Sequence, residues 1–116
     1  MSKVLTNHQI ARVCHQANKA FCKSIGDVSH VDWEQAQQWQ KDSAVAGVEH
    51  IINNPNAAPS DSHESWLKFK ENDGWSYGPV KDEIKKEHPC FVPYDELPTE
   101  EKSKDYIFAA VVKSLI

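Results

Sequence analysis

The sequence has few cysteines and no long apolar run, and each shortage excludes a class of protein. Its three cysteines are an odd number without C-x-x-C spacing, which argues against a secreted disulfide framework and a zinc ribbon. The chain has no run of eighteen consecutive apolar residues, and its first residues lack the apolar segment of a signal peptide. We therefore expect a cytoplasmic protein that is neither exported nor inserted in a membrane.

Positive charge is also in short supply. Lys and Arg number 13 against 17 Asp and Glu, which gives a formal net charge of -4. A chain of this charge repels a polyanion such as duplex DNA. We therefore expect no binding to nucleic acid polymers.

The motifs of common enzymes are absent as well. The sequence contains no G-x-S-x-G, P-loop, H-E-x-x-H or G-x-G-x-x-G, and Gly74-x-x-x-Gly78 lacks the Lys-Ser or Lys-Thr that a phosphate loop needs. No pair among the six histidines has the short spacing of a zinc clamp. We expect no enzymatic activity, no metal and no cofactor.

What the sequence does contain is helical periodicity. At 116 residues it is long enough for one domain with its own core, and we expect residues 1–116 to form a single unit. Apolar residues recur at steps of three and four between Thr6 and Ile25, which predicts an α-helix. Thr6 and Gln9 have the spacing of a capping box, and Gly26 is a stop signal.

Further helices follow this first one. Asp32 is a candidate N-cap for a second helix, which completes an N-terminal helical pair over residues 6–53. In all, helices are expected over residues 6–25, 32–52, 61–73 and from Pro98 onward, with short strands near residues 75–77 and 90–92. The predicted fold class is mainly α, with four helices and a small strand element.

One flank of the first helix carries polar residues. At about 100° per residue, His15, Asn18 and Cys22 lie together between the apolar stripe and the solvent side. This flank either faces a ligand pocket or hydrogen-bonds a neighbouring loop. The spacing alone leaves both possibilities open.

The densest pattern lies within residues 59–116. It reads H-x-x-W, G-W-x-Y-G, K-x-H-P, P-Y-x-x-L and K-x-x-D, carried by His63, Trp66, Gly74, Trp75, Tyr77, Gly78, Lys86, His88, Pro89, Pro93, Tyr94, Leu97, Lys102 and Asp105. This ordered set resembles the RyR domain, the repeat of ryanodine receptors that also occurs in free-standing bacterial and phage proteins. The resemblance implies a four-helix repeat fold.

The same segment combines flat rings with cations. Aromatic rings stack on planar ligands, and Lys or His donors suit phosphate or carboxylate groups, so a ligand with an adenine ring and phosphates would use both. The candidate ligand-binding residues are Trp75, Tyr77, Lys81, Lys85, His88 and Tyr94, together with His63, His15 and Asn18. The alternative is that G-W-x-Y-G is a structural corner with buried rings and glycines at positive φ.

The resemblance also suggests competing functions. Ryanodine receptors are associated with cyclic ADP-ribose signalling, and free-standing RyR-domain proteins look like parts of phage and bacterial conflict biology. This implies a non-enzymatic module that binds an ADP-ribose-type or cyclic nucleotide signal. If the chain is phage-encoded, it would act in the host cytoplasm as a sponge that sequesters an immune second messenger and evades anti-phage defence.

The first alternative is a protein-interaction or structural module, like the repeats of ryanodine receptors. A weaker one is a nucleotide hydrolase with His63 or His88 as general base. Ryanodine receptors carry these units as tandem pairs, so a single copy is expected to pair with an identical subunit as a homodimer.

Overall fold

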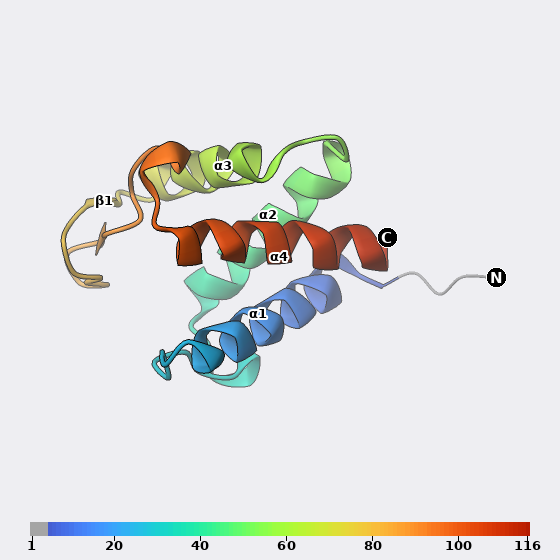
Figure 1. Cartoon of the computed structure of the whole chain (residues 1–116), viewed down its shortest axis with the longest axis horizontal. Helices are drawn as coiled ribbons and strands as arrows, with labels where there is room; N and C mark the ends of the chain where they lie inside the picture. The colour runs from blue at the N-terminus through green and yellow to red at the C-terminus, as the bar shows by residue number, and fades with distance from the viewer. Residues whose placement is uncertain (1–4) are drawn as a thin grey trace.

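Four α-helices make up most of residues 5–116, the part of the chain that the computed structural model describes (Figure 1). They are α1 Asn7–Ser24, α2 Gln38–Asn53, α3 Pro59–Asn72 and α4 Thr99–Leu115. Two 3-10 turns, η1 Trp33–Gln35 and η2 Tyr94–Glu96, and two short strands, β1 Ser76–Tyr77 and β2 Glu87–His88, complete the chain. The predicted mainly α fold with four helices is confirmed. None of the described helices has the length and apolar character needed to span a bilayer.

The two ends of α1 follow the signals in its sequence. The Thr6 hydroxyl accepts a hydrogen bond from the Gln9 amide at 3.1 Å, and the Gln9 side chain accepts one from the Thr6 amide at 2.9 Å. At the other end Gly26 adopts a φ of +92°, and the Asp27 amide donates to the Cys22 carbonyl at 2.8 Å. This bond and that of the Gly26 amide form a Schellman motif, which ends the helix.

The second predicted helix is wrong at its start. Instead of one helix over residues 32–52, the chain forms the η1 turn, continues as two extended residues and begins α2 at Gln38. The Asp32 carboxylate does not cap this segment, because it accepts a hydrogen bond from Lys19 at 2.7 Å. The Trp33 amide donates to the Gln16 side chain at 2.9 Å. Side chains of α1 therefore hold η1 in place of a continuous helix.

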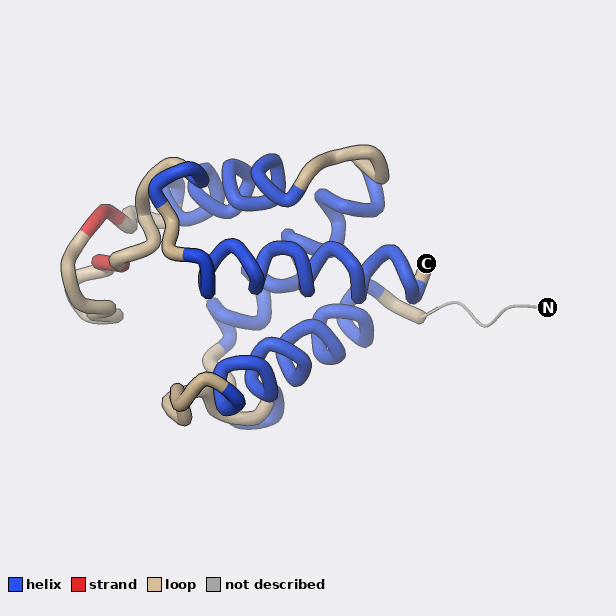
Figure 2. The backbone as a smooth tube through the Cα atoms, viewed as in Figure 1, coloured by secondary structure: helices blue, strands red, loops and turns tan. Residues whose placement is uncertain are grey.

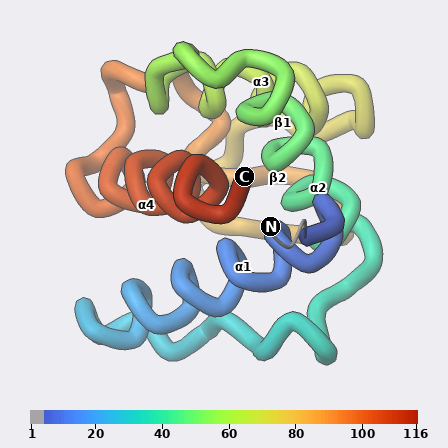
Figure 3. Tube along the Cα trace, turned by 90° about the vertical axis from the view of Figure 1, so that its right-hand side faces the viewer, coloured from blue at the N-terminus to red at the C-terminus, as the bar shows by residue number. Residues whose placement is uncertain are grey.

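The hydrophobic core joins three of the helices. It contains Ile10, Ala11 and Cys14 of α1, Trp33 of η1, Val48 and Ile51 of α2, and Ala109 and Val112 of α4. Helix α4 lies between α3 and α1 in both views of the backbone (Figures 1 and 3). Helix α3 packs on the other side, against α2 and α4.

The segment between α3 and α4 projects from one end of the helices (Figure 2). Its strands β1 and β2 run parallel, with Ser76 opposite Glu87 and Tyr77 opposite His88. The second strand was expected at residues 90–92 and lies instead at 87–88. The Cys90 amide donates to the Nδ1 atom of His88 at 3.0 Å, so it is not available to a strand ladder.

Candidate functional site

The end of α3 places a lysine beside a tryptophan. Gly74 adopts a φ of +90°, and the Trp75 amide donates to the Lys70 carbonyl at 2.9 Å. With the bond from the Gly74 amide to Glu71, this is a second Schellman motif, in which Lys70 and Trp75 hold the positions that commonly make a hydrophobic contact. Here the contact is between a cation and a ring, since the Lys70 ammonium lies 5.3 Å from the Trp75 ring centroid.

Two further residues complete this arrangement. Trp39, in the first turn of α2, lies against Trp75 with ring centroids 5.3 Å apart. The Lys70 ammonium is 4.1 Å from the Trp39 centroid, and the Lys81 ammonium is 5.4 Å from it. Trp39, Lys70, Trp75 and Lys81 are called the tryptophan–lysine cluster below. They bring residues from α2, α3 and the projecting segment to one place.

Lys70 is the unusual member of the cluster. Its side chain is buried, with 3% of the residue exposed, and its ammonium has no hydrogen-bond partner among the described residues. Burial lowers its pKa to about 8, although Asp73 acts in the opposite direction. The ring faces stabilise the ammonium in part, yet a buried charge without a counter-ion remains costly. An anionic group that reached Lys70 would remove that cost.

A series of ring contacts, called the aromatic chain below, runs from Trp75 through His88, Trp66 and His63 to Tyr94. Trp75 lies 6.3 Å from His88, and His88 lies edge-on to Trp66 at 5.2 Å. Trp66 stacks on His63 at 5.6 Å, and His63 is 6.0 Å from Tyr94. These rings come from α3, the turn that follows it, β2 and η2, so the contacts tie the projecting segment to the helices.

His88 enters this chain as a neutral ring. Its Nδ1 atom accepts the Cys90 amide, so the neutral ring carries its proton on Nε2. Burial lowers the pKa of His88 to about 4, and the charge of Lys81 adds to the effect. At neutral pH the ring therefore supplies a hydrogen-bond donor and no charge, and it is a weak base.

Buried His63 and half-buried Asp105 form a pair between α3 and α4. The Nε2 atom of His63 donates to the Val92 carbonyl at 2.7 Å, while Nδ1 lies 3.9 Å from the Asp105 carboxylate. Burial, together with the charge of Glu101, raises the pKa of Asp105 to about 7. Both ring nitrogens of His63 thus face groups that hold α3 against the following loop and α4.

Of the ligand-binding residues predicted from the sequence, the structure brings only some together. Trp75, Lys81 and His88 lie in or next to the tryptophan–lysine cluster, and His63 and Tyr94 lie at the far end of the aromatic chain. Trp75 is buried at 6% exposure, as the structural-corner interpretation expects. Four of the nine predicted residues, Trp75, His88, His63 and Tyr94, therefore pack on other rings and help to hold the segment against the helices.

Tyr77 and Lys85 are not part of this cluster. A strand over residues 75–77 would place Trp75 and Tyr77 on the same face, and this expectation is wrong, because Tyr77 is 57% exposed whereas Trp75 is buried. Of these two aromatic residues, Tyr77 belongs to β1, whereas Trp75 precedes the strand and takes its direction from the Schellman turn. Lys85 lies in an exposed turn, where its amide donates to the Asp82 carboxylate at 3.1 Å. The spacing of Lys81 and Lys85 would align them on a helical turn, but residues 83–86 form a hydrogen-bonded turn instead of a helix.

His15 and Asn18 have local partners. The Nε2 atom of His15 donates to the Val31 carbonyl at 2.7 Å, and Asn18 accepts a weak hydrogen bond from the Cys22 thiol at 3.9 Å. The His15 ring also lies edge-on to Trp33 at 5.6 Å. This favours the interpretation in which the flank of α1 hydrogen-bonds a neighbouring loop.

Two residues of the cluster, Trp39 and Lys70, are missing from the set predicted from the sequence. The sequence does place Lys70 with the aromatic residues. Trp66 follows His63 by three residues and Lys70 follows Trp66 by four, so all three lie on one face of α3. The contact of Trp39 with Trp75 was not predictable from local patterns, since it joins residues far apart in the sequence.

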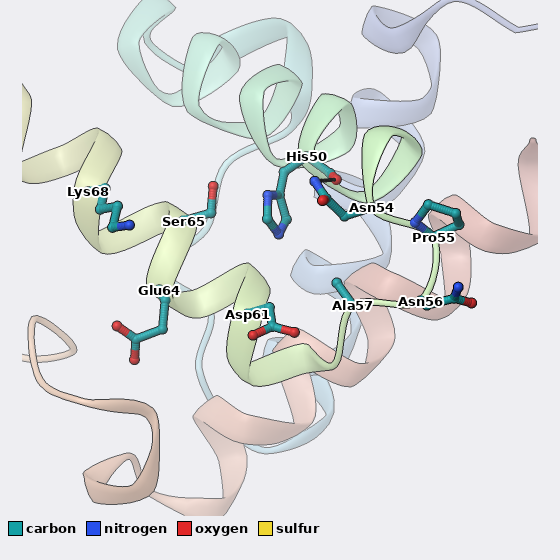
Figure 4. A pocket seen from close by; sticks show the side chains of 9 residues that line it. All are labelled: His50, Asn54, Pro55, Asn56, Ala57, Asp61, Glu64, Ser65 and Lys68. Atoms are coloured by element: carbon teal, nitrogen blue, oxygen red, sulfur yellow. Dashed lines mark hydrogen bonds between the residues drawn. The ribbon is translucent and has the colours of Figure 1, made fainter.

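A concave region lies between α2 and α3, away from the tryptophan–lysine cluster (Figure 4). This open hollow of about 710 Å³ is lined by His50, Asn54, Pro55, Asn56, Ala57, Asp61, Glu64, Ser65 and Lys68. It contains none of the predicted ligand-binding residues. Its two carboxylates, Asp61 and Glu64, outnumber its one lysine, Lys68, so the lining would on balance repel a phosphate, and His50 supplies its only aromatic ring. The tryptophan–lysine cluster is therefore the better candidate for an aromatic anion.

The comparison with known families agrees with the sequence pattern. The model of the family described as RyR domain matches residues 48–116. The match covers the end of α2, α3, the projecting segment and α4, and leaves α1 outside. Helix α1 nevertheless supplies three residues of the common core.

Proposed function

The chain belongs to the RyR domain family, and from the geometry of its site we propose that it is a non-enzymatic module for binding a nucleotide-derived small molecule of the ADP-ribose or cyclic nucleotide type. The binding site is the tryptophan–lysine cluster. The observation that carries the proposal is the buried Lys70 ammonium, which lies over Trp39 and has no hydrogen-bond partner within residues 5–116.

The cluster offers the two kinds of contact that such a ligand needs. Trp39 is only half-buried and presents a flat ring, and stacking of a base on an aromatic side chain contributes roughly 1–3 kcal/mol. Lys70 and Lys81 supply charge-assisted donors, each of which contributes about 1.5–3 kcal/mol to a phosphate contact. A phosphate near both ammonium groups would also supply the charge that the buried Lys70 lacks.

Two finer proposals rest on family membership. We propose that the protein acts as a cytoplasmic homodimer, with each subunit taking the place of the neighbouring repeat in a tandem pair. For a phage-encoded chain, sequestration of a messenger in the host cytoplasm is the corresponding role. In that role the ligand is bound and released without chemical change.

A protein-interaction module is the second candidate function. The projecting segment exposes three apolar side chains, with Tyr77 at 57%, Val80 at 71% and Ile84 at 96% exposure. Apolar residues exposed together on a protruding segment are typical of a contact surface for another protein. This surface does not include the buried rings of the aromatic chain, so the two functions are separable by mutation.

Calorimetric titration of the full chain with ADP-ribose, cyclic ADP-ribose isomers and cyclic oligonucleotides tests the main proposal. We expect one of them to bind and chromatography to recover it intact. Lys70→Met should abolish that binding, whereas Lys68→Met, on the exposed side of the same helix, should preserve it. Unchanged binding by Lys70→Met would place the ligand outside the cluster. Failure of every ligand to bind would favour the interaction module, and recovery of a cleaved product would show an enzyme.

A further inference from the structure

A second group of chemically active side chains lies at the end of α1, separate from the tryptophan–lysine cluster. Cys22 is in the last turn of α1, and Asp27 and His30 are in the loop that follows (Figure 1). The Cys22 sulfur, a carboxylate oxygen of Asp27 and a ring nitrogen of His30 all lie within 4.8 Å of one another. Thiolate, carboxylate and imidazole are three groups that Zn²⁺ takes as ligands in proteins.

The backbone brings the first two of these residues together. In the Schellman motif that ends α1, the Asp27 amide donates to the Cys22 carbonyl at 2.8 Å. Main-chain bonds therefore fix the separation of the sulfur-bearing and carboxylate-bearing residues. A site that is held by the backbone loses little conformational freedom when a cation binds.

The distance between Asp27 and His30 suits two ligands of one cation. The His30 Nε2 atom lies 3.4 Å from the Asp27 Oδ2 atom. Two ligand atoms at about 2.0–2.1 Å from a tetrahedral zinc ion are separated by about 3.3–3.4 Å. A charge-assisted hydrogen bond would be shorter, at about 2.7–2.9 Å. The observed spacing is thus closer to a coordination edge than to a tight ion pair.

Asp27 is also oriented by its neighbours. The amide and hydroxyl of Ser29 both donate to the Asp27 Oδ1 atom, at 3.0 and 2.6 Å. Hydrogen bonds of this kind commonly orient ligands from outside a metal site. They occupy Oδ1, so that Oδ2, the oxygen near His30, is the one presented to the cation.

From these contacts we propose that Cys22, Asp27 and His30 bind one Zn²⁺ ion, with the fourth coordination position open to water or an added ligand. The thiolate and the carboxylate balance the charge of the ion. Cys22 is fully buried, whereas the side chains of Asp27 and His30 are 41% and 23% exposed. The ion would therefore reach the site from the loop, where Asp27 and His30 are accessible to solvent, and would bind at the end of α1.

The sequence did not suggest this site. Its spacing, C-x₄-D-x₂-H, is not a zinc clamp of two close histidines or a pair of close cysteines. The ligands meet because the chain reverses at Gly26, whose φ is +92°. The proposal is independent of the nucleotide site, since it uses none of the same residues.

Titration of chelator-treated full-length protein with Co²⁺ tests the proposal, because a thiolate ligand gives cobalt an intense near-ultraviolet charge-transfer band. We expect one Co²⁺ per chain, with that band, and displacement of Co²⁺ by Zn²⁺. His30→Gln removes a half-buried ligand and leaves the core intact, and it should weaken Zn²⁺ binding by at least about tenfold. Cys22→Ser should abolish the thiolate band.

Matched controls separate this site from the remaining cysteines and histidines. Cys90→Ser and His50→Gln, which lie outside the site, should leave the stoichiometry and the band unchanged. The proposal is wrong if Co²⁺ binds without a thiolate band. It is equally wrong if His30→Gln, shown to be folded by circular dichroism, binds Zn²⁺ as tightly as the parent protein.

Discussion

The Lys70 ammonium lies 4.1 Å from the centre of the Trp39 ring and, within residues 5–116, has no hydrogen-bond acceptor. Aromatic faces attract a cation, but they do not replace the water or the carboxylate that a buried ammonium gives up. The arrangement therefore lowers the stability of the free protein and favours binding of an anion.

Lys70→Met should stabilise the free protein at pH 7 by roughly 1–3 kcal/mol, because it removes a buried charge and keeps the apolar stem. The pKa of Lys70 is lowered from 10.5 to about 8, so the unfolded chain holds this proton more tightly. The parent protein should thus gain stability as the pH rises from about 8 to 10.5, and the advantage of methionine should shrink there. Urea denaturation at several pH values measures the effect, with Lys68→Met as the control; a less stable Lys70→Met protein would contradict the prediction.

Lys81→Gln should weaken binding of the nucleotide-type ligand by about tenfold or more. A charge-assisted contact contributes about 1.5–3 kcal/mol, and about 1.4 kcal/mol corresponds to a factor of ten. Lys85→Gln is the matched control, because it removes the same charge from the same segment away from the cluster. Calorimetry on both variants measures the difference. Equal losses would indicate a long-range charge effect and not a contact at Lys81.

Asp105→Asn should stabilise the protein at pH 8 and have little effect near pH 4. Burial raises the pKa of Asp105 from 3.8 to about 7, so the folded protein binds this proton more tightly than the unfolded chain. Stability from this group is present below pH 3.8 and is lost as the pH rises through about 7. We expect a gain of roughly 1–3 kcal/mol at pH 8, measured by denaturation, with exposed Asp95→Asn as control. A loss at pH 8 would show that the charged carboxylate stabilises His63.

Gly78→Ala should destabilise the projecting segment by about 1–3 kcal/mol. A Cβ atom at this position would lie 2.5 Å from the Glu87 Cβ, so β1 and β2 would have to separate. Gly26→Ala is a useful comparison, because it has a positive φ but no atom within 4 Å of the added group. It should cost only the strain of the left-handed backbone, about 1 kcal/mol. Thermal denaturation of the two variants should rank Gly78→Ala as the less stable.

The proposed homodimer has a direct test. Sedimentation equilibrium at micromolar concentration should give twice the chain mass of 13.2 kDa. A mass of one chain at that concentration would rule out the dimer. That result would leave the nucleotide site as proposed, because all four members of the tryptophan–lysine cluster come from one chain.

The helices were predictable because their signals are local. The capping box at Thr6 and the glycines that end α1 and α3 act over a few residues, and the structure has each of them as expected. The start of α2 was missed because it depends on contacts made by Gln16 and Lys19 across the fold. Local patterns do not contain such tertiary contacts.

The site was predicted less well for a related reason. Residue types indicated rings and cations correctly, but the choice among them depended on the directions of two turns. Trp75 points inward because of the turn at Gly74, and Tyr77, two residues later, points outward. A strand pattern of two residues is too short to predict that difference. Lys70 was left out because a lysine is normally exposed.

The two Schellman turns also have a consequence for how this protein can change. Each joins the first and last residues of a six-residue segment by a main-chain bond, Cys22 to Asp27 in one and Lys70 to Trp75 in the other. Because the bond does not involve side chains, the turn itself does not depend on the residue types at its two ends. Of the four end residues, Cys22, Lys70 and Trp75 are buried and constrained by packing, whereas the side chain of Asp27 is 41% exposed. Natural variation or protein engineering can therefore alter the chemistry of these helix ends most easily at Asp27.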